Sequence, residues 1–388
     1  MKILRIISSM DPRGGGPSEG IRQVSGALAR MGHHSECLTA DDPRAGWLAE
    51  QPLPIHAMGP GKGSYAYCPQ LGTWLAQHGR DYDAFVVSGL WQHHGFAAYK
   101  ALRNLGRNYF VMTHGMLDPW FKHNYPLKHL KKWLYWPWAD YRLLRDARAV
   151  LFTSEEERLL ARQSFWLYKA TEVVVSYGTS PPPEAGQRLR ELFLAEYPVL
   201  RSKRLLLFLG RIHEKKGCDL LVQAFAKVAK DEPALHLVVA GPDQTGLVPK
   251  LQSQARALGV ADRITWPGML HGDQKWGAFY SSEAFVLPSH QENFGIAVAE
   301  ALGCGLPALI SNKVNTWREI EADGAGFVEA DTADGAERLI NRWLALDAVG
   351  RERMRVNATL SFKRRFTVAA MAASLIEVMG RPNRDHAR

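Results

Sequence analysis

The chain has 388 residues, of which 46% are hydrophobic and 22% charged, and its formal net charge at pH 7 is +9. This length and composition predict a globular protein of roughly two or three domains and exclude a mainly disordered chain. No apolar run of about 18 residues occurs, so no membrane-spanning helix is expected, and residues 1–10 are too short for a signal peptide. Four widely separated cysteines without a CxxC pair argue against zinc and disulfides and fit a reducing cytoplasm.

The first part of the chain alternates predicted strands with helices. A strand over residues 2–8 leads into a glycine-rich turn at 14–18 and a helical pattern that ends at Gly32. Further strands are predicted at residues 36–39, 84–88, 109–113, 149–153 and 173–176. Each is a nearly continuous apolar run, which is typical of a parallel sheet covered on both faces by helices.

Consecutive prolines interrupt this alternation within residues 179–187, because proline cannot occupy a helix interior or a central strand. The alternation resumes with strands at 205–210, 235–241, 284–289 and 307–311, a helix at 218–230 and a last apolar helix near 368–379. We therefore predict two doubly wound α/β domains, with ligands at the carboxyl ends of the strands and in the cleft between the domains. The predicted boundaries are 1–180 for the N-terminal domain, 181–200 for a linker, 201–364 for the C-terminal domain and 365–388 for a C-terminal helix and tail.

The turn after the strand at 205–210 carries two cations, Arg211 and Lys216, and leads into the helix at 218–230. Helix N-termini bind phosphate through free N–H groups and a partial positive charge. An arginine fork and a lysine ammonium would strengthen such a diphosphate site. An ordinary solvated basic turn is the alternative interpretation of the same spacing.

A second group of polar residues follows the strand at 284–289. Glu292 lies in the loop, and Glu300 lies on the helix that residues 293–295 open. Free N–H groups near Gly295 and Ile296 can hold an anion, and the two carboxylates can accept hydroxyls, Glu300 from a ribose and Glu292 from a second polyol. The alternative is that Glu292 caps the helix and Glu300 is solvated.

These residues resemble those of the retaining glycosyltransferases of family four. The resemblance rests on Glu292-x7-Glu300, the Gly-x-Pro at 305–307, GR…KKG at 210–217 and AGP at 240–242, and more loosely on the glycines at 14–16 and Thr113-His114-Gly115. It implies the GT-B fold, in which two Rossmann-like domains face each other and a C-terminal helix crosses back to the N-terminal domain. Ser176-Tyr177-Gly178 departs from the Pro-Asn-Gly that many members have there.

The resemblance also implies a role for each matched residue. Arg211 and Lys216 would bind the donor diphosphate, and Glu300 its ribose. Glu292 would hold the donor sugar, and His114 would lie near the reacting centre. Further donor contacts are implied for Gly15, Gly16, Gly241, Gly268, Met269, Leu270, Asn293, Phe294, Gly295 and Ile296. Neither a metal nor another cofactor is expected, since family members usually transfer without one.

Four other motifs are not assigned the metal, dinucleotide or catalytic function that they partly match. The D-x-D at 81–83 precedes its strand, which is the wrong edge of the sheet for a metal site. The glycines at 14–20 lack the third position of a dinucleotide fingerprint. His93-His94 has no further spaced ligand for zinc and is interpreted as a site-lining or merely polar loop. The acidic residues 155–157 after Ser154 are typical of a capped helix start.

Residues 119–148 form a basic aromatic segment with seven Lys or Arg, two Asp and four Trp. Its aromatic side chains could fill the core of a helical hairpin while the cations are solvated. It could instead dock on an anionic membrane surface. Nucleic-acid binding is the weakest interpretation, because no nucleic-acid module motif occurs, so no nucleic-acid partner is expected.

We therefore expect a cytoplasmic enzyme, peripheral at the inner face of the membrane if the basic segment docks there. It would move a hexose from a UDP-sugar such as UDP-glucose to a glycan or lipid-linked acceptor in surface or exopolysaccharide biosynthesis. A GDP-mannose-dependent mannosyltransferase is the alternative donor assignment. An NAD-dependent oxidoreductase or epimerase is the alternative of another class, since Asp41 mimics a ribose-binding acid. The intact donor motif argues against a non-catalytic sugar-nucleotide sensor.

Overall fold

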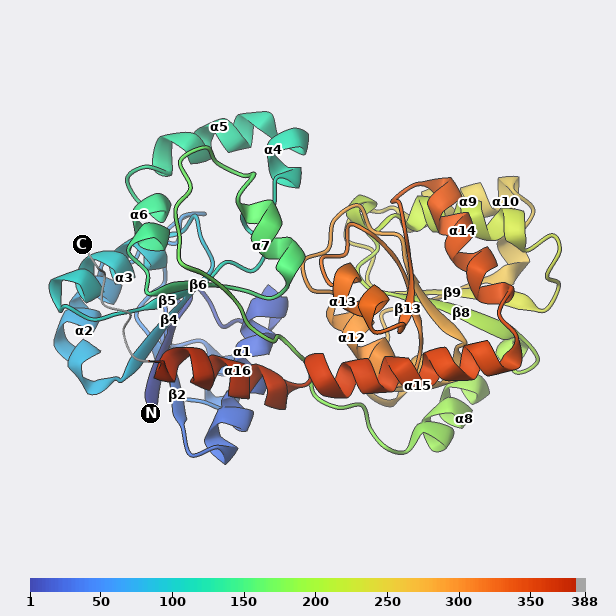
Figure 1. Cartoon of the computed structure of the whole chain (residues 1–388), viewed down its shortest axis with the longest axis horizontal. Coiled ribbons are helices and arrows are strands. Elements are labelled where there is room, and N and C mark those ends of the chain that lie inside the picture. The colour runs from blue at the N-terminus through green and yellow to red at the C-terminus, as the bar shows by residue number, and fades with distance from the viewer. Residues whose placement is uncertain (382–388) are drawn as a thin grey trace. The chain divides into compact units, whose positions relative to one another are not determined.

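The structure is a computed structural model that describes residues 1–381 (Figure 1). The described chain divides into two compact units. Unit 1 holds residues 1–178 together with the helix that begins at Val368, and unit 2 holds Thr179–Thr367. Each unit contains one parallel sheet with helices, which confirms the two predicted α/β domains.

Unit 1 has a seven-stranded sheet in the order β3-β2-β1-β4-β5-β6-β7. Its strands are β1 (Lys2–Ile6), β2 (His34–Thr39), β3 (Ile55–Ala57), β4 (Ala84–Ser88), β5 (Phe110–Met112), β6 (Ala149–Phe152) and β7 (Glu172–Val174). Its helices are α1 (Gly16–Arg30), α2 (Gln70–His78), α3 (His93–Asn104), α4 (Trp120–Asn124), α5 (Pro126–Tyr135), α6 (Asp140–Arg145), α7 (Glu155–Ala161) and α16 (Val368–Gly380). Strand β3 was not predicted, because an edge strand of 3 residues is too short to show a period.

Unit 2 has a six-stranded sheet in the order β10-β9-β8-β11-β12-β13. Its strands are β8 (Arg204–Leu209), β9 (Leu235–Ala240), β10 (Ile264–Gly268), β11 (Ala284–Leu287), β12 (Ala308–Ser311) and β13 (Gly326–Glu329). Its helices are α8 (Gly186–Glu196), α9 (Cys218–Val228), α10 (Val248–Ala257), α11 (Gly272–Ser281), α12 (Ile296–Gly303), α13 (Trp317–Ala322), α14 (Ala333–Leu344) and α15 (Ala348–Arg365). Short 3-10 turns include Pro12–Gly14, Gly79–Asp81 and Glu214–Lys216.

Both sheets reverse their strand order at the same kind of position. In unit 1 the order reverses between β1 and β4, and in unit 2 between β8 and β11. At such a point the loops after neighbouring strands diverge to opposite faces of the sheet, which leaves a crevice at the carboxyl edge. The glycine-rich turn follows β1 and the Arg211–Lys216 turn follows β8, so each lies at a reversal.

Helix α8 corrects the expected linker over residues 181–200. Its side chains Leu189 and Phe193 are fully buried. They pack against α11 so closely that a Cβ at Gly277 would lie 2.4 Å from the Leu189 carbonyl oxygen. Residues 186–196 are therefore a packed helix of unit 2, because α11 covers their apolar side chains.

The C-terminal helix α16 belongs to unit 1, as the resemblance implied. It packs beside α1 (Figure 1). Ser374 Oγ accepts a hydrogen bond of 3.2 Å from the backbone N–H of Ser176, and Arg148 Nη1 donates to the Met379 carbonyl at 3.4 Å. Its apolar side chains, which include the buried Met371 and Leu375, complete the unit 1 core.

Candidate active site

The turn between β8 and α9 is shaped by Gly217. This residue has a left-handed backbone with φ of +64°, and an added Cβ would lie 2.1 Å from the carbonyl oxygen of Pro288. Pro288 directly follows β11, so the close approach presses the turn against the end of the neighbouring strand. The hydroxyl of Ser289 and the N–H of His290 also donate to the Lys215 carbonyl, at 2.8 and 2.7 Å. These contacts join the Arg211–Lys216 turn to the loop that carries Glu292.

Lys216 and Glu292 form an ion pair at this edge of the sheet. The Lys216 side chain is 13% exposed and that of Glu292 is 21% exposed. The Glu292 backbone is held on both sides, since its N–H donates to the Lys313 carbonyl and its carbonyl accepts from the Asn315 N–H, both at 2.9 Å. Helix α12 begins after Gly295 without a side-chain cap, so the capping alternative for Glu292 is wrong.

Glu300 is buried and paired, which contradicts its interpretation as a solvated helix residue. It is 8% exposed on α12, and its Oε1 accepts a 2.7 Å hydrogen bond from Lys275 Nζ on α11. Lys275 could not be predicted from the sequence, because no motif marks a lone lysine on an adjacent helix. The contact with the Lys275 ammonium fixes the direction of the carboxylate, whose oxygens can also accept hydrogen bonds from hydroxyls.

The other residues expected to bind the donor follow strands at the same edge. Gly241 follows β9 with φ of +146°, and a Cβ there would lie 1.7 Å from the Gly210 carbonyl oxygen, so only glycine fits. Gly268 ends β10 with φ of +72°, and Met269 after it is 57% exposed. Arg211 is exposed and donates to Gln244 at 3.2 Å. The remaining members lie after β10 or at the start of α12: Leu270 is half-buried, Phe294 is buried, and Asn293, Gly295 and Ile296 precede or open that helix.

In unit 1 the glycine-rich turn after β1 leads directly into α1. Gly15 has φ of +93°, and Gly16 is the first residue of the helix. The hydroxyl of Tyr177 donates to the Gly16 carbonyl at 3.3 Å, and a Cβ at Gly20 would lie 2.0 Å from that hydroxyl oxygen. Tyr177, at the position where this chain departs from Pro-Asn-Gly, therefore packs against the start of α1.

His114 lies in the turn after β5 in a left-handed conformation, with φ of +50°. Its ring contacts Tyr177 edge to face, with centroids 6.2 Å apart. Burial, with a smaller contribution from the charge of Arg5, lowers the pKa of His114 to about 4. His114 is therefore a neutral imidazole at pH 7 and can exchange hydrogen bonds but carries no charge.

Two family models match the chain along most of its length. Residues 15–178 match the glycosyl transferase 4-like domain, and residues 191–360 match glycosyl transferases group 1. The chain belongs to the family-four glycosyltransferases. The first match lies within unit 1 and the second within unit 2. The second match contains both the Lys216–Glu292 pair and the Lys275–Glu300 pair.

The curated relatives of this glycosyltransferase are matched over part of their length. D-inositol 3-phosphate glycosyltransferase from Geodermatophilus obscurus is 32% identical over 207 residues, which cover 47% of this chain and 44% of the relative. Alpha-D-kanosaminyltransferase from Streptomyces kanamyceticus is 28% identical, covering 57% of each chain. The chain thus spans about half the length of the curated relatives it matches. Anabaena HepE, crystallised with UDP and glucose, superposes with a TM-score of 0.75 at 18% identity over 98% of this chain and 99% of HepE, which shows the shared GT-B fold.

The D-x-D at 81–83, His94 and Asp41, none of which is assigned to the donor site, make hydrogen bonds within unit 1. Asp81 and Asp83 lie before β4 at the amino edge, where Asp83 accepts from the Lys2 N–H at 2.7 Å. His94 hydrogen-bonds to the Ser88 carbonyl at 2.9 Å. Asp41 accepts from the Met10 N–H at 2.8 Å, which holds the loop after β1 in place. Within residues 1–381 no cluster of three or more His, Cys, Asp or Glu is placed to hold a metal ion.

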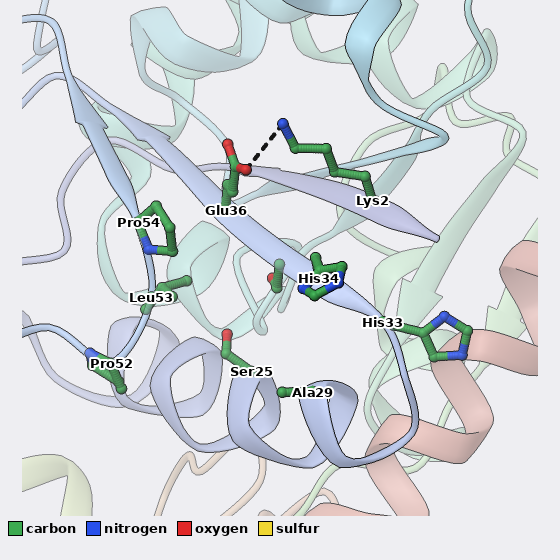
Figure 2. A pocket seen from close by; sticks show the side chains of 10 residues that line it. Lys2, Ser25, Ala29, His33, His34, Glu36, Pro52, Leu53 and Pro54 are labelled. Carbon is green, nitrogen blue, oxygen red and sulfur yellow. Dashed lines mark ion pairs between the residues drawn. The ribbon is translucent and has the colours of Figure 1, made fainter.

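A pocket of about 290 Å³ lies beside the starts of β1 and β2 and the later turns of α1 (Figure 2). Lys2 and Glu36 form an ion pair of 3.0 Å at its wall. Burial would raise the pKa of Glu36, but hydrogen bonds from His56 and Tyr82 and the Lys2 charge lower it to about 2. The other lining residues are Ser25, Ala29, His33, His34, Ser35, Pro52, Leu53 and Pro54. None of them was a predicted donor residue.

The basic aromatic segment has a buried face that confirms the core-filling interpretation in part. Trp136 is fully buried and stacks on Phe165, with centroids 4.2 Å apart. The opposite face is exposed, and it carries Leu127 (78% exposed), Leu130 (59%), Leu134 (74%) and Trp138 (67%). None of the helices within residues 1–381 is long and apolar enough to cross a bilayer.

Asp140 in this segment should make stability depend on pH. Burial raises its pKa to about 7 from 3.8, although the Trp91 N–H and Lys132 oppose the shift. Between these two values the unfolded chain has lost the proton and the folded chain retains it, so stability falls as pH rises from about 4 to about 7. Asp140→Asn should remove this loss, about 3 kcal/mol between pH 4.5 and pH 8. Denaturant unfolding of both proteins at pH 4.5 and pH 8 checks it, and an equal pH response would contradict it.

Proposed function

We propose that this chain is a retaining hexosyltransferase that uses a nucleotide-diphosphate sugar as donor. The observation that carries the proposal is the Lys216–Glu292 pair, which sets an ammonium group beside a carboxylate at the carboxyl edge of the unit 2 sheet. A diphosphate would replace the carboxylate as the partner of Lys216. Glu292 would then be free to accept hydroxyls of the transferred sugar.

The residues of this edge fit the charges that develop during transfer. The bond between the anomeric carbon and the diphosphate oxygen breaks, which leaves positive charge on the sugar and negative charge on the leaving group. Lys216, Arg211 and the first N–H groups of α12 would stabilise the leaving diphosphate. In a front-face route the leaving oxygen takes the proton of the acceptor hydroxyl as the new bond forms, so no enzymic nucleophile is required. A double displacement would require one.

We infer further that Glu300, held by Lys275, binds the ribose, and that neutral His114 contacts the donor sugar. UDP-glucose is the first donor to test, because the crystals of HepE, which shares the fold, contain UDP and glucose. GDP-mannose is the second. We propose a hydroxyl of a glycan or lipid-linked molecule as acceptor, in surface polysaccharide assembly. The names of the matched relatives, which include inositol 3-phosphate, widen the set of acceptors to try.

A thermal-shift titration with UDP, GDP, ADP, TDP and NAD, each with and without EDTA, tests the donor assignment. Binding stabilises the folded state by RT ln(1 + [L]/Kd), so about 100 Kd of ligand adds about 2.7 kcal/mol. We expect UDP to raise Tm in the presence or absence of EDTA, and Lys216→Ala to remove most of that shift. A shift with NAD alone would favour the oxidoreductase, and loss of the UDP shift with EDTA would require a metal.

We also propose that the exposed face of α5 docks on an anionic membrane surface at the cytoplasmic face. Leu127, Leu130 and Leu134 lie at i, i+3 and i+7 and form one apolar stripe, and the exposed Lys128 and Lys131 flank it. Leucine side chains can enter the interfacial layer while the lysines attract anionic headgroups.

Co-sedimentation with vesicles tests this docking. Leu130→Asp/Leu134→Asp should lower the bound fraction at least about fivefold on vesicles that contain phosphatidylglycerol, because charge enters the apolar stripe. Val349→Asp is the matched control, since Val349 is 74% exposed on α15 of unit 2. Equal binding of the wild type, the double leucine variant and Val349→Asp would contradict the proposal. So would wild-type binding to purely zwitterionic vesicles that equals its binding to vesicles with phosphatidylglycerol.

A further inference from the structure

Glu157 is a buried carboxylate whose hydrogen-bond capacity is used by two loops. It lies in the first turn of α7 and is 4% exposed. Its Oε1 accepts from Thr113 Oγ1 at 2.8 Å and from the Gly115 N–H at 2.6 Å. Its Oε2 accepts from the Thr153 N–H and from Thr153 Oγ1, both at 2.7 Å. The predicted cap also forms, since Ser154 Oγ accepts from the Glu157 N–H at 3.1 Å, but the side chain does more than begin a helix.

The two donors on Oε1 stand on either side of His114. His114 itself has φ of +50° and Gly115 has φ of +75°. A left-handed histidine is an unfavourable backbone state, which persists only where surrounding contacts hold it. The bonds from Thr113 and Gly115 to one carboxylate oxygen supply such contacts. Within residues 1–381 the Nε2 atom of His114 is buried and has no hydrogen-bond partner.

We infer that Glu157 is a positioning residue that sets the His114 turn for the donor sugar. The inference rests on the role proposed for His114. Glu157 ties the turn after β5 to Thr153, which follows β6, and so fixes the imidazole relative to the rigid sheet. It contacts neither the donor nor the acceptor in this scheme, and its effect passes through His114.

The site requires a carboxylate rather than an amide. Each oxygen of Glu157 accepts from one backbone N–H and one hydroxyl. A hydroxyl can rotate to accept, but a backbone N–H can only donate. In Glu157→Gln the new NH2 group must therefore face the N–H of either Gly115 or Thr153, and that pair of donors cannot bond. The substitution keeps the shape of the side chain and breaks the clamp.

Kinetics of Glu157→Gln test the inference, with Glu156→Gln as the matched control on the same helix turn. We expect Glu157→Gln to lower kcat at least about tenfold with the donor KM within about twofold, and Glu156→Gln to change neither. In the His114→Ala background Glu157→Gln should cause no further loss, because the two residues act as one unit. A full additional loss in that background, or unchanged kcat for Glu157→Gln alone, would overturn the inference.

An NMR readout separates this inference from the proposed function. The imidazole signal of His114, assigned by its loss in His114→Ala, should shift in Glu157→Gln and stay in place in Glu156→Gln. Absence of that shift would overturn the positioning role even if the enzyme is active. If the wild type turns over no nucleotide sugar, the proposed function fails and the NMR comparison still decides Glu157. If Glu157→Gln does not fold, Thr113→Val removes only one bond of the clamp and should give the same NMR shift and a smaller loss of kcat.

Discussion

Replacement of Lys216 by alanine should reduce turnover with a nucleotide-sugar donor about 100-fold, because the leaving diphosphate loses a direct positive charge. The structure sharpens this expectation, since Lys216 is 13% exposed and already directed at Glu292. A half-buried charge acts in a lower effective dielectric than a solvated one, so its effect on a nearby phosphate is larger. Steady-state kinetics with the donor identified by thermal shift measure the loss.

The neighbouring Lys215 provides a matched control. Its backbone carbonyl accepts from Ser289 and His290, and this contact does not depend on the side chain. Lys215→Ala should therefore keep turnover within about twofold. Equal losses for the two alanine variants would mean that general positive charge in the turn, and not Lys216, supports the reaction. A loss below twofold for Lys216→Ala would remove its assigned role.

Gly217→Ala should have the largest effect on stability, about 3–4 kcal/mol of the free energy of unfolding. Two costs add there. The left-handed φ of +64° is unfavourable for alanine, and the new Cβ would lie 2.1 Å from the Pro288 carbonyl oxygen. The backbone must shift at the point where the Lys216 turn meets the Glu292 loop, so turnover should fall as well. Denaturant unfolding and donor kinetics on the same preparation measure both effects.

Gly246→Ala separates the two costs. Gly246 has almost the same φ, +68°, but nothing lies within 4 Å of an added Cβ. Only the backbone strain remains, so we expect a loss of about 1 kcal/mol and unchanged turnover. Similar losses of stability for the two variants would show that the approach to Pro288 relaxes at little cost.

Most of the fold could be predicted from the sequence because its strands are nearly continuous apolar runs. A strand buried on both faces must be apolar throughout, and this pattern is local, so β1, β4, β8, β9 and β11 were found near their observed bounds. Strands β3 and β13 and helix α8 were not predicted. Strand β3 is too short for a period, and the prolines before α8 suggested a linker although its own apolar residues are buried by α11.

The residues of the candidate site fall into two groups, those that short local motifs predict and those that depend on contacts with distant segments. Four site residues could be nominated from the sequence: Arg211, Lys216, Glu292 and Glu300. They lie in two short segments with recognisable spacing, and each segment follows the end of a predicted strand. Lys275 and Glu157 could not be nominated, because the partner that gives each of them its role lies on a segment distant in the chain. Lys275 pairs with a residue on another helix, and Glu157 binds the turn at Thr113–Gly115, 42 or more positions away.

The sequence by itself therefore determined the family, the two parallel sheets and the order of the motifs along the chain. These properties depend on the local periodicity of apolar residues and on short motifs. Only the tertiary structure decided which charges are paired, that His114 is partly buried and neutral, and that Tyr177 packs against Gly20 where the family motif changes. Those properties depend on distances between residues far apart in the chain, which packing of the sheets and helices sets.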